Sequence, residues 1–156
     1  MTHKVETRLR ELGITLPDPV APVGAYVAHV ISGSTLYISG QISLDPEEGL
    51  ITGTLGDDLS LEQGQRAARA CGLNVLAQAR DAVGGDWDRI VRCLKLGGFV
   101  NAVPGYPDHP KVLNGASDVM VEVLGDAGKH VRFAVGANSL PLNIAVEVEA
   151  TFEVRS

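Results

Sequence analysis

Near the C-terminus, the segment from Val146 to Val154 alternates without a break between apolar and polar side chains. Successive side chains of a β-strand point to opposite faces of its sheet, so this pattern predicts a strand with one dry face and one face that carries carboxylates. The chain is therefore expected to build a sheet whose two faces differ in chemistry. The apolar positions are Val146, Val148, Ala150, Phe152 and Val154, and the polar positions are Glu147, Glu149, Thr151 and Glu153.

Three other segments carry apolar residues at helical spacing and are bounded by helix start and stop signals. Ser60 and Gln63 form a capping box at the start of the longest one. Proline is favoured in the first turn of a helix and glycine just past its end, which delimits the second long helix. The predicted helices lie between Val5 and Gly13, between Ser60 and Gly84, and between Pro110 and Gly125.

The remaining segments are rich in β-branched and aromatic residues and predict further strands. Two of them flank the turn Ser32-Gly33-Ser34 as a hairpin, and Gly97-Gly98 interrupts another, which indicates a bulge or a close approach by another chain. The expected strands are 26–31, 35–39, 50–55 and 90–103, besides the C-terminal one.

This order of elements predicts an α+β sandwich with the two long helices on one face of a mixed sheet. The chain has no third layer to put on the other face. Oligomerisation is the simplest way to cover that face, since a second copy presents the same chemistry. With 156 residues, the chain is expected to form one domain, 1–156.

Composition excludes several classes of function. The formal net charge is −6 and aromatic residues make up 4% of the chain, which makes nucleic acid an unfavourable partner because its binding requires clustered cations and stacking rings. No apolar run approaches the roughly 20 residues of a membrane span, and no secretory signal begins the sequence. We therefore expect a cytoplasmic protein without membrane contact.

The sequence holds few groups with an evident chemical role. None of its four histidines has a partner at metal-ligand spacing, so no metal site is expected, and Cys71 and Cys93 lie in apolar runs typical of buried packing. Arg132 stands alone in an apolar run. It is either an edge-strand charge that reaches solvent or a planar fork for a small carboxylate. Glu147 is either solvated or, if an oligomer covers its face, hydrogen-bonded.

Several separated motifs resemble the YjgF/RidA family, the reactive-intermediate imine deaminases once described as L-PSP endoribonucleases. The resemblance covers about Val23 to Val154 and leaves residues 1–22 as an N-terminal extension. Near the C-terminus it rests on Arg132, Leu140-Pro141 and Val146–Glu149, which have the family's spacing. Earlier in the chain, Gly24–Val27 resembles the family's Gly-Pro-Tyr and Ile38–Ile42 resembles its Ser-Gly-Gln strand. Asn114 stands where the family has an asparagine that opens its second helix.

The resemblance implies an α+β, chorismate-mutase-like (bacillus type) sandwich with a mixed six-stranded sheet and two long helices on one face. It also implies a homotrimer with sites in clefts between subunits. Within such a site, Arg132 would clamp the carboxylate of a small metabolite and Glu147 would orient the attacking water. The resemblance further assigns Tyr26 and Ser39 to the pocket lining, the Gly40 backbone to contact with the bound acid or water, and Asn114 to lining or support.

The implied reaction is hydrolysis of 2-imino or 2-enamino acids to 2-keto acids and ammonia, without a metal or cofactor. Besides the N-terminal extension, two features depart from the family. Ala134 stands where the founding enzymes carry a cysteine, and the region 97–110 differs from their compact strand and loop. The alternative is a non-catalytic binder or sensor of small carboxylates. An endoribonuclease is a third possibility, which the acidic charge and scarce aromatics disfavour.

Overall fold

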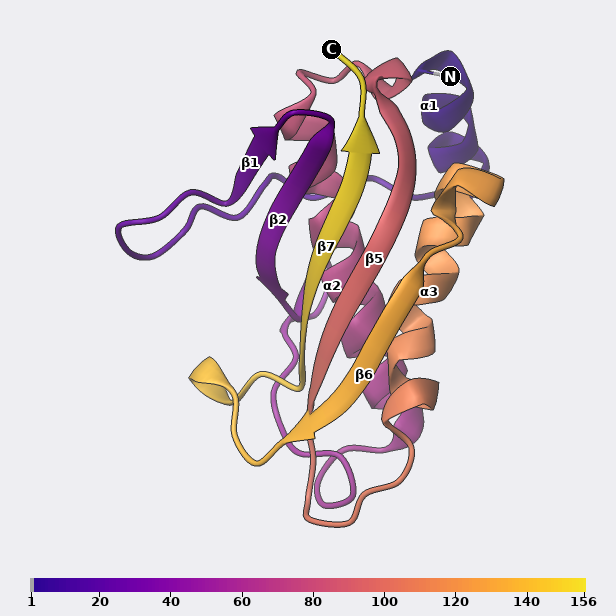
Figure 1. Ribbon diagram of the computed structural model, residues 1–156. Coiled ribbons are helices and arrows are strands. Elements are labelled where there is room, and N and C mark those ends of the chain that lie inside the picture. The colour runs from indigo at the N-terminus through magenta and orange to yellow at the C-terminus, as the bar shows by residue number, and fades with distance from the viewer. Residues whose placement is uncertain (1) are drawn as a thin grey trace.

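A computed structural model describes residues 2–156, so Met1 of the predicted extension lies outside the described residues. Helices and strands are arranged as one sheet backed by helices (Figure 1). The helices are α1 (Thr2–Glu11), α2 (Leu61–Ala82) and α3 (His109–Leu124); the strands are β1 (His29–Ser32), β2 (Thr35–Ile42), β3 (Leu44–Asp45), β4 (Gly49–Leu50), β5 (Ile90–Asn101), β6 (Val131–Ala137) and β7 (Val146–Val154); and short 3₁₀ turns cover Trp87–Arg89, Gly125–Gly128 and Pro141–Asn143.

The main sheet has five strands in the order β1-β2-β7-β5-β6, so the expected six-stranded sheet is wrong. It is mixed, as predicted, because β5 and β6 pair in parallel while the other pairs are antiparallel. The strand predicted over 50–55 is also wrong beyond its first residue. Gly49–Leu50 pairs with β3 in a separate ribbon, and Thr52 and Leu55 form isolated bridges only. Gly53 has a φ of 128°, which turns the chain out of the extended conformation that a ladder needs.

The strand β7 lies at the centre of the sheet and confirms the predicted alternation. Its five apolar side chains are buried beneath the helices, and its polar positions are half-buried or exposed on the other face. The long helices α2 and α3 both lie on the face that these apolar residues cover (Figure 1). The helix α2 begins with the predicted capping box. The backbone N–H of Gln63 donates to the Ser60 hydroxyl, and the backbone N–H of Ser60 donates to the side-chain oxygen of Gln63.

Close approaches on both faces of β5 depend on glycines. A Cβ at Gly97 would lie 2.5 Å from the Phe133 ring, and one at Gly98 would overlap the Leu113 side chain. The predicted approach of another chain at Gly97-Gly98 is thus made by side chains of the same chain. The bulges of β5 lie nearer its start, between Ile90 and Lys95.

The N-terminal residues divide into a docked helix and an exposed arm. Val5 and Leu9 of α1 are buried in the common core, and the Trp87 indole donates to the Glu6 carboxylate at 2.8 Å. The segment 21–27, which we call the arm, then protrudes beside β1 (Figure 1). Its Val23 is 94% exposed. In the described part of the chain, no helix is long and apolar enough to span a membrane.

The contact between α2 and α3 can be tested at Gly115. A Cβ there would overlap the Gln65 carbonyl oxygen of α2, so Gly115→Ala must push the helices apart. We expect a loss of about 1–3 kcal/mol in the free energy of unfolding, although alanine alone favours a helix by about 1 kcal/mol. Chemical denaturation measures this free energy of unfolding. The exposed Asp118 on the same helix gives the control, since Asp118→Ala should change stability by less than about 0.5 kcal/mol. A stabilised Gly115→Ala protein would contradict this contact.

Candidate functional site

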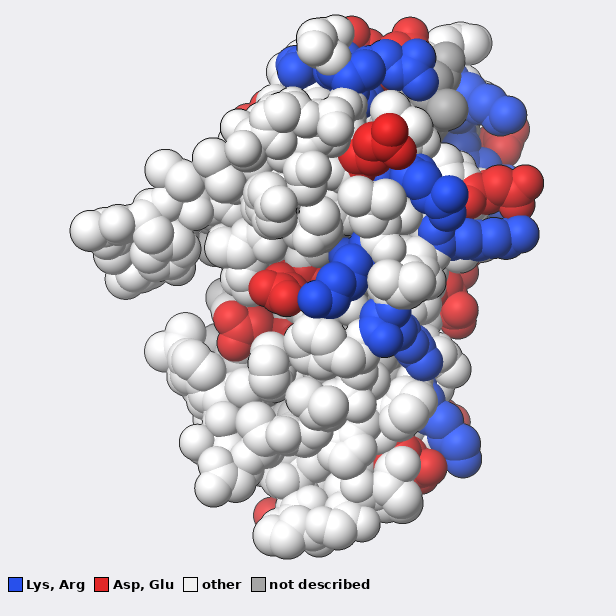
Figure 2. Space-filling view, in the orientation of Figure 1, with Lys and Arg blue, Asp and Glu red and all other residues white. Residues whose placement is uncertain are grey.

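The sheet face without helices, called the open face from here on, presents mostly uncharged side chains around a few charged ones (Figure 2). Tyr37, Phe99 and Val135 are 39–50% exposed on it. Phe133 packs edge-on against Phe99 with 5.5 Å between ring centroids, and the Lys95 ammonium lies 5.3 Å from the Phe133 centroid. Apolar surface of this kind is typical of a contact face.

Glu147 stands on the open face of β7, between the buried Val146 and Val148. Burial raises the pKa of its carboxyl group above the usual range, although the side chain is only half-buried. Opposite it, β2 has a register shift between Ile38 and Gln41, and Gly40 in that bulge lies directly against the carboxylate, where a Cβ would overlap it. Among residues 2–156, no hydrogen bond or ion pair satisfies this carboxylate.

Ser39 lies next to Gly40 in β2, and Tyr26 lies on the arm. The Ser39 hydroxyl donates to the Ala28 carbonyl at 3.1 Å, which ties β2 to the end of the arm. Ser39 and Glu149 line a shallow hollow of about 240 Å³ on the open face. Tyr26 is 56% exposed on the arm two residues before Ala28, and its ring covers Gly24.

Two hydrogen bonds tie Arg132 of β6 to α3. Its Nη1 donates to the Ser117 hydroxyl at 3.0 Å and its Nη2 to the Pro110 carbonyl at 3.1 Å. The guanidinium is therefore fixed against the helix and does not extend freely into solvent. A guanidinium has five N–H donors, so about three remain for a ligand.

Asn114 does not open the second long helix. The helix α3 begins at His109, after an N-cap at Asp108, which places Asn114 within it. Its side chain is exposed. Spacings of three and four residues put Asn114 on the same helix face as Pro110 and Ser117, the two partners of Arg132.

One chain does not bring Arg132 and Glu147 together. Arg132 lies on the helix-covered side at the sheet edge, whereas Glu147 lies on the open face. Arg132 pairs with Leu96 and Glu147 with Phe99, on opposite sides of β5. Two strand spacings and three residues separate their Cα atoms by about 14 Å. Glu147, Gly40 and Ser39 thus form one group of predicted site residues, and Arg132 and Asn114 form another, while Tyr26 lies on the exposed arm.

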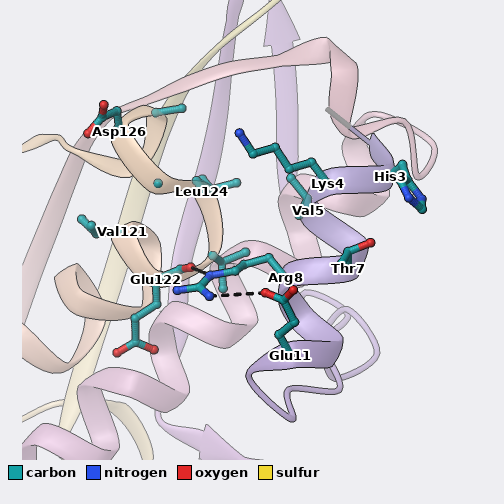
Figure 3. A pocket seen from close by; sticks show the side chains of 13 residues that line it. His3, Lys4, Val5, Thr7, Arg8, Glu11, Val121, Glu122, Leu124 and Asp126 are labelled. Atoms are coloured by element: carbon teal, nitrogen blue, oxygen red, sulfur yellow. Dashed lines mark hydrogen bonds and ion pairs between the residues drawn. The ribbon is translucent and has the colours of Figure 1, made fainter.

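A larger hollow than the one beside Ser39 lies elsewhere. It measures about 660 Å³ and runs between α1 and the end of α3 (Figure 3). Arg8 crosses it, donating to the Glu122 carbonyl at 2.9 Å and pairing with Glu11 at 3.4 Å. None of the predicted site residues lines it. Contacts within the protein already hold Arg8 there, so the size of the hollow does not identify it as the site.

The cysteines are buried, as predicted. The Cys71 thiol donates to the Val146 carbonyl at 3.3 Å, and burial, with the nearby charge of Glu147, raises its pKa well above the usual range. Burial raises the pKa of Cys93 to about 12. Neither is a nucleophile at neutral pH. Within residues 2–156, no group of three or more His, Cys, Asp or Glu side chains could hold a metal ion.

Sequence reasoning missed two residues at Arg132, namely Ser117 and His130. The Ser117 hydroxyl contacts the His130 Nε2 atom at 2.9 Å as well as Arg132. Both residue types are common on protein surfaces. The only signal in the sequence is that Ser117 lies one helical turn after Asn114.

Comparisons with known proteins agree with this fold. Residues 6–153 match the model of the family described as "YjgF/chorismate mutase-like, putative endoribonuclease". Protein TCP17 of Trypanosoma cruzi is 44% identical over 98% of this chain and 96% of its own length. The crystal structure of Atu1372 from Agrobacterium tumefaciens, of unknown function, is 43% identical, covers 99% of this chain and 96% of its own, and has a TM-score of 0.89.

A more distant structure carries a ligand. E. coli TdcF, solved with bound serine, is 27% identical over 91% of this chain and 96% of its own, with a TM-score of 0.62. The family model spans nearly all of the chain, and solved YjgF and RidA proteins share its fold. The chain therefore belongs to the YjgF/RidA family.

Proposed function

We propose that this protein hydrolyses 2-imino and 2-enamino acids to 2-keto acids and ammonia. The observation that carries the proposal is the state of Arg132, whose guanidinium is held by two hydrogen bonds to α3 while about three of its N–H donors stay free. A planar fork held in this way fits a substrate carboxylate with two parallel hydrogen bonds. Asn114, on the same helix face, would line the pocket beside it.

Glu147 is the group proposed to act on water. Its carboxylate has no protein partner in residues 2–156, and its pKa is raised by burial, which suits a group that accepts a proton in the reaction. Gly40 lies against it without a side chain and leaves the backbone accessible to water or bound acid. Ser39 and Tyr26 would complete the wall on this side.

The reaction requires orientation more than strong activation. The water oxygen attacks C2 of the imine as one of its protons passes to Glu147, and Glu147 then gives this proton to the imine nitrogen. The hydroxyl proton of the tetrahedral intermediate moves to the same nitrogen, the C–N bond breaks, and a carbonyl and ammonia are released. Arg132 holds the carboxylate next to C2. The imine carbon is therefore already oriented toward the water when the reaction begins.

The two groups of site residues meet only if they come from different subunits, since about 14 Å and the sheet separate Arg132 from Glu147 within one chain. We therefore include a homotrimer in the proposal, with the edge formed by β6 and α3 of one subunit beside the open face of the next. The exposed apolar side chains of that face and of the arm support such a contact.

The nature of the ligand is supported by E. coli TdcF, which was solved with bound serine. Serine carries a carboxylate beside a carbon that bears nitrogen, as a 2-imino acid does. Ala134 lies two residues after Arg132, so the proposed mechanism uses no thiol at that position. Ribonuclease activity is a weaker alternative, because the net charge of −6 opposes binding to phosphates.

Replacing Arg132 tests the carboxylate clamp. Arg132→Lys keeps the charge but cannot form the paired planar hydrogen bonds, so turnover should fall at least about 10²-fold while the fold persists. Ammonia release from 2-iminobutanoate, made in situ by an amino-acid oxidase, measures turnover above the uncatalysed rate. Asp118→Ala is the control. Near-normal turnover in a folded Arg132→Lys variant would refute the carboxylate clamp. A wild-type protein that binds 2-ketobutanoate but shows no turnover would favour the role of a sensor.

Glu147 gives a prediction about both activity and pH. The pKa of Glu147 is higher in the folded chain than in the unfolded chain, where it is about 4.3. Between these two pKa values the folded chain binds more protons than the unfolded chain. The contribution of Glu147 to stability therefore falls as pH rises through that range. Glu147→Gln should therefore melt no lower than wild type at pH 7, with the difference vanishing below about pH 4, and turnover should drop about 10²-fold. A lower melting temperature at pH 7 would indicate a structural partner instead.

A further inference from the structure

A chain of three hydrogen bonds leads away from the Arg132 guanidinium. Arg132 Nη1 donates to the Ser117 hydroxyl oxygen at 3.0 Å, the same hydroxyl lies 2.9 Å from His130 Nε2, and His130 Nδ1 lies 2.6 Å from the Gly128 carbonyl oxygen. The residues come from β6, α3 and the segment between them. All three side chains are half-buried.

The partners at both ends fix the direction of every proton. A carbonyl oxygen only accepts, so His130 Nδ1 must carry a hydrogen and donate to Gly128. In the neutral ring, Nε2 is then an acceptor and takes the Ser117 hydroxyl proton. The lone pairs of the Ser117 oxygen are left for Arg132, whose guanidinium can only donate. Each donor in the chain has one acceptor, and each bond polarises the next.

We propose that Ser117 and His130 are positioning residues that set the orientation of Arg132 for carboxylate binding. His130 holds the Ser117 hydroxyl in the one rotation that turns its oxygen toward the guanidinium, and the Pro110 carbonyl holds the other nitrogen at 3.1 Å. As far as it concerns the ligand, the inference rests on the proposed function. The positioning itself concerns only the protein and can be measured without a ligand.

Neither residue is expected to touch the substrate. The Ser117 oxygen accepts a hydrogen bond from Arg132, and its hydroxyl donates one to His130. Both ring nitrogens of His130 form hydrogen bonds within the protein. Replacing Ser117 or His130 should therefore weaken substrate binding more than it slows the chemical step. Removing a hydrogen bond to a charged group corresponds to about a tenfold change in affinity.

The binding arm of the experiment uses 2-ketobutanoate as the probe and isothermal titration calorimetry as the measurement. Ser117→Ala should raise the dissociation constant about tenfold, and its KM should rise with little change in kcat. Ser117→Thr keeps the hydroxyl and should restore affinity. His130→Ala should have a smaller effect, and the double variant should bind no worse than Ser117→Ala, because the two residues act in series. Asp118→Ala, the exposed neighbour on α3, should bind as wild type does.

The second arm records the Arg132 side-chain N–H signals by ¹H–¹⁵N NMR without ligand, with Arg132→Lys to assign them. We expect ordered signals in wild type and Ser117→Thr, and averaged signals in Ser117→Ala. Unchanged order in Ser117→Ala, or an additive double variant, would overturn the inference. If order is lost in Ser117→Ala but the wild type binds no 2-ketobutanoate, the positioning stands and the proposed function fails.

Discussion

Burial of one face of β7 under the helices is the interaction on which the rest of the structure depends. The strand pairs with β2 on one side and β5 on the other, so its register fixes both. Its apolar side chains face the core, and strict alternation then places Glu147 and Glu149 on the opposite face. Because none of the described helices covers that face in one chain, the carboxylates and the exposed aromatic side chains share a surface suited to contact with another subunit.

The same sheet divides the candidate site. It separates a group around Glu147, on the open face, from Arg132, which α3 holds at the sheet edge. Each group has a property that a ligand or a neighbouring subunit would use: Glu147 has an unpaired, desolvated carboxylate, and Arg132 has oriented donors that remain free. In the proposed trimer, subunit contact would both cover the open face and complete the site, so assembly and catalysis would depend on the same surface.

Periodicity predicted the elements that bury a face, and it failed where tertiary contacts decide. The alternation of β7 and the capping box at Ser60 were confirmed because local pattern and core burial agree there. The strand predicted over 50–55 was wrong because the positive φ of Gly53 overrides its composition. The anchoring of Arg132 could not be predicted, since Ser117 lies 15 residues away and meets it only when α3 packs beside β6.

Subunit complementation tests most directly the central claim that the site is formed between chains. Arg132→Lys and Glu147→Gln, each expected to turn over about 10²-fold more slowly than wild type, would be unfolded together in equal amounts and refolded, with native mass spectrometry to verify the proposed mixed trimers. If each site takes Arg132 from one subunit and Glu147 from the next, random mixing makes about one site in four intact, so about a quarter of wild-type ammonia release should return. Mixed trimers as inactive as the parents would contradict the account.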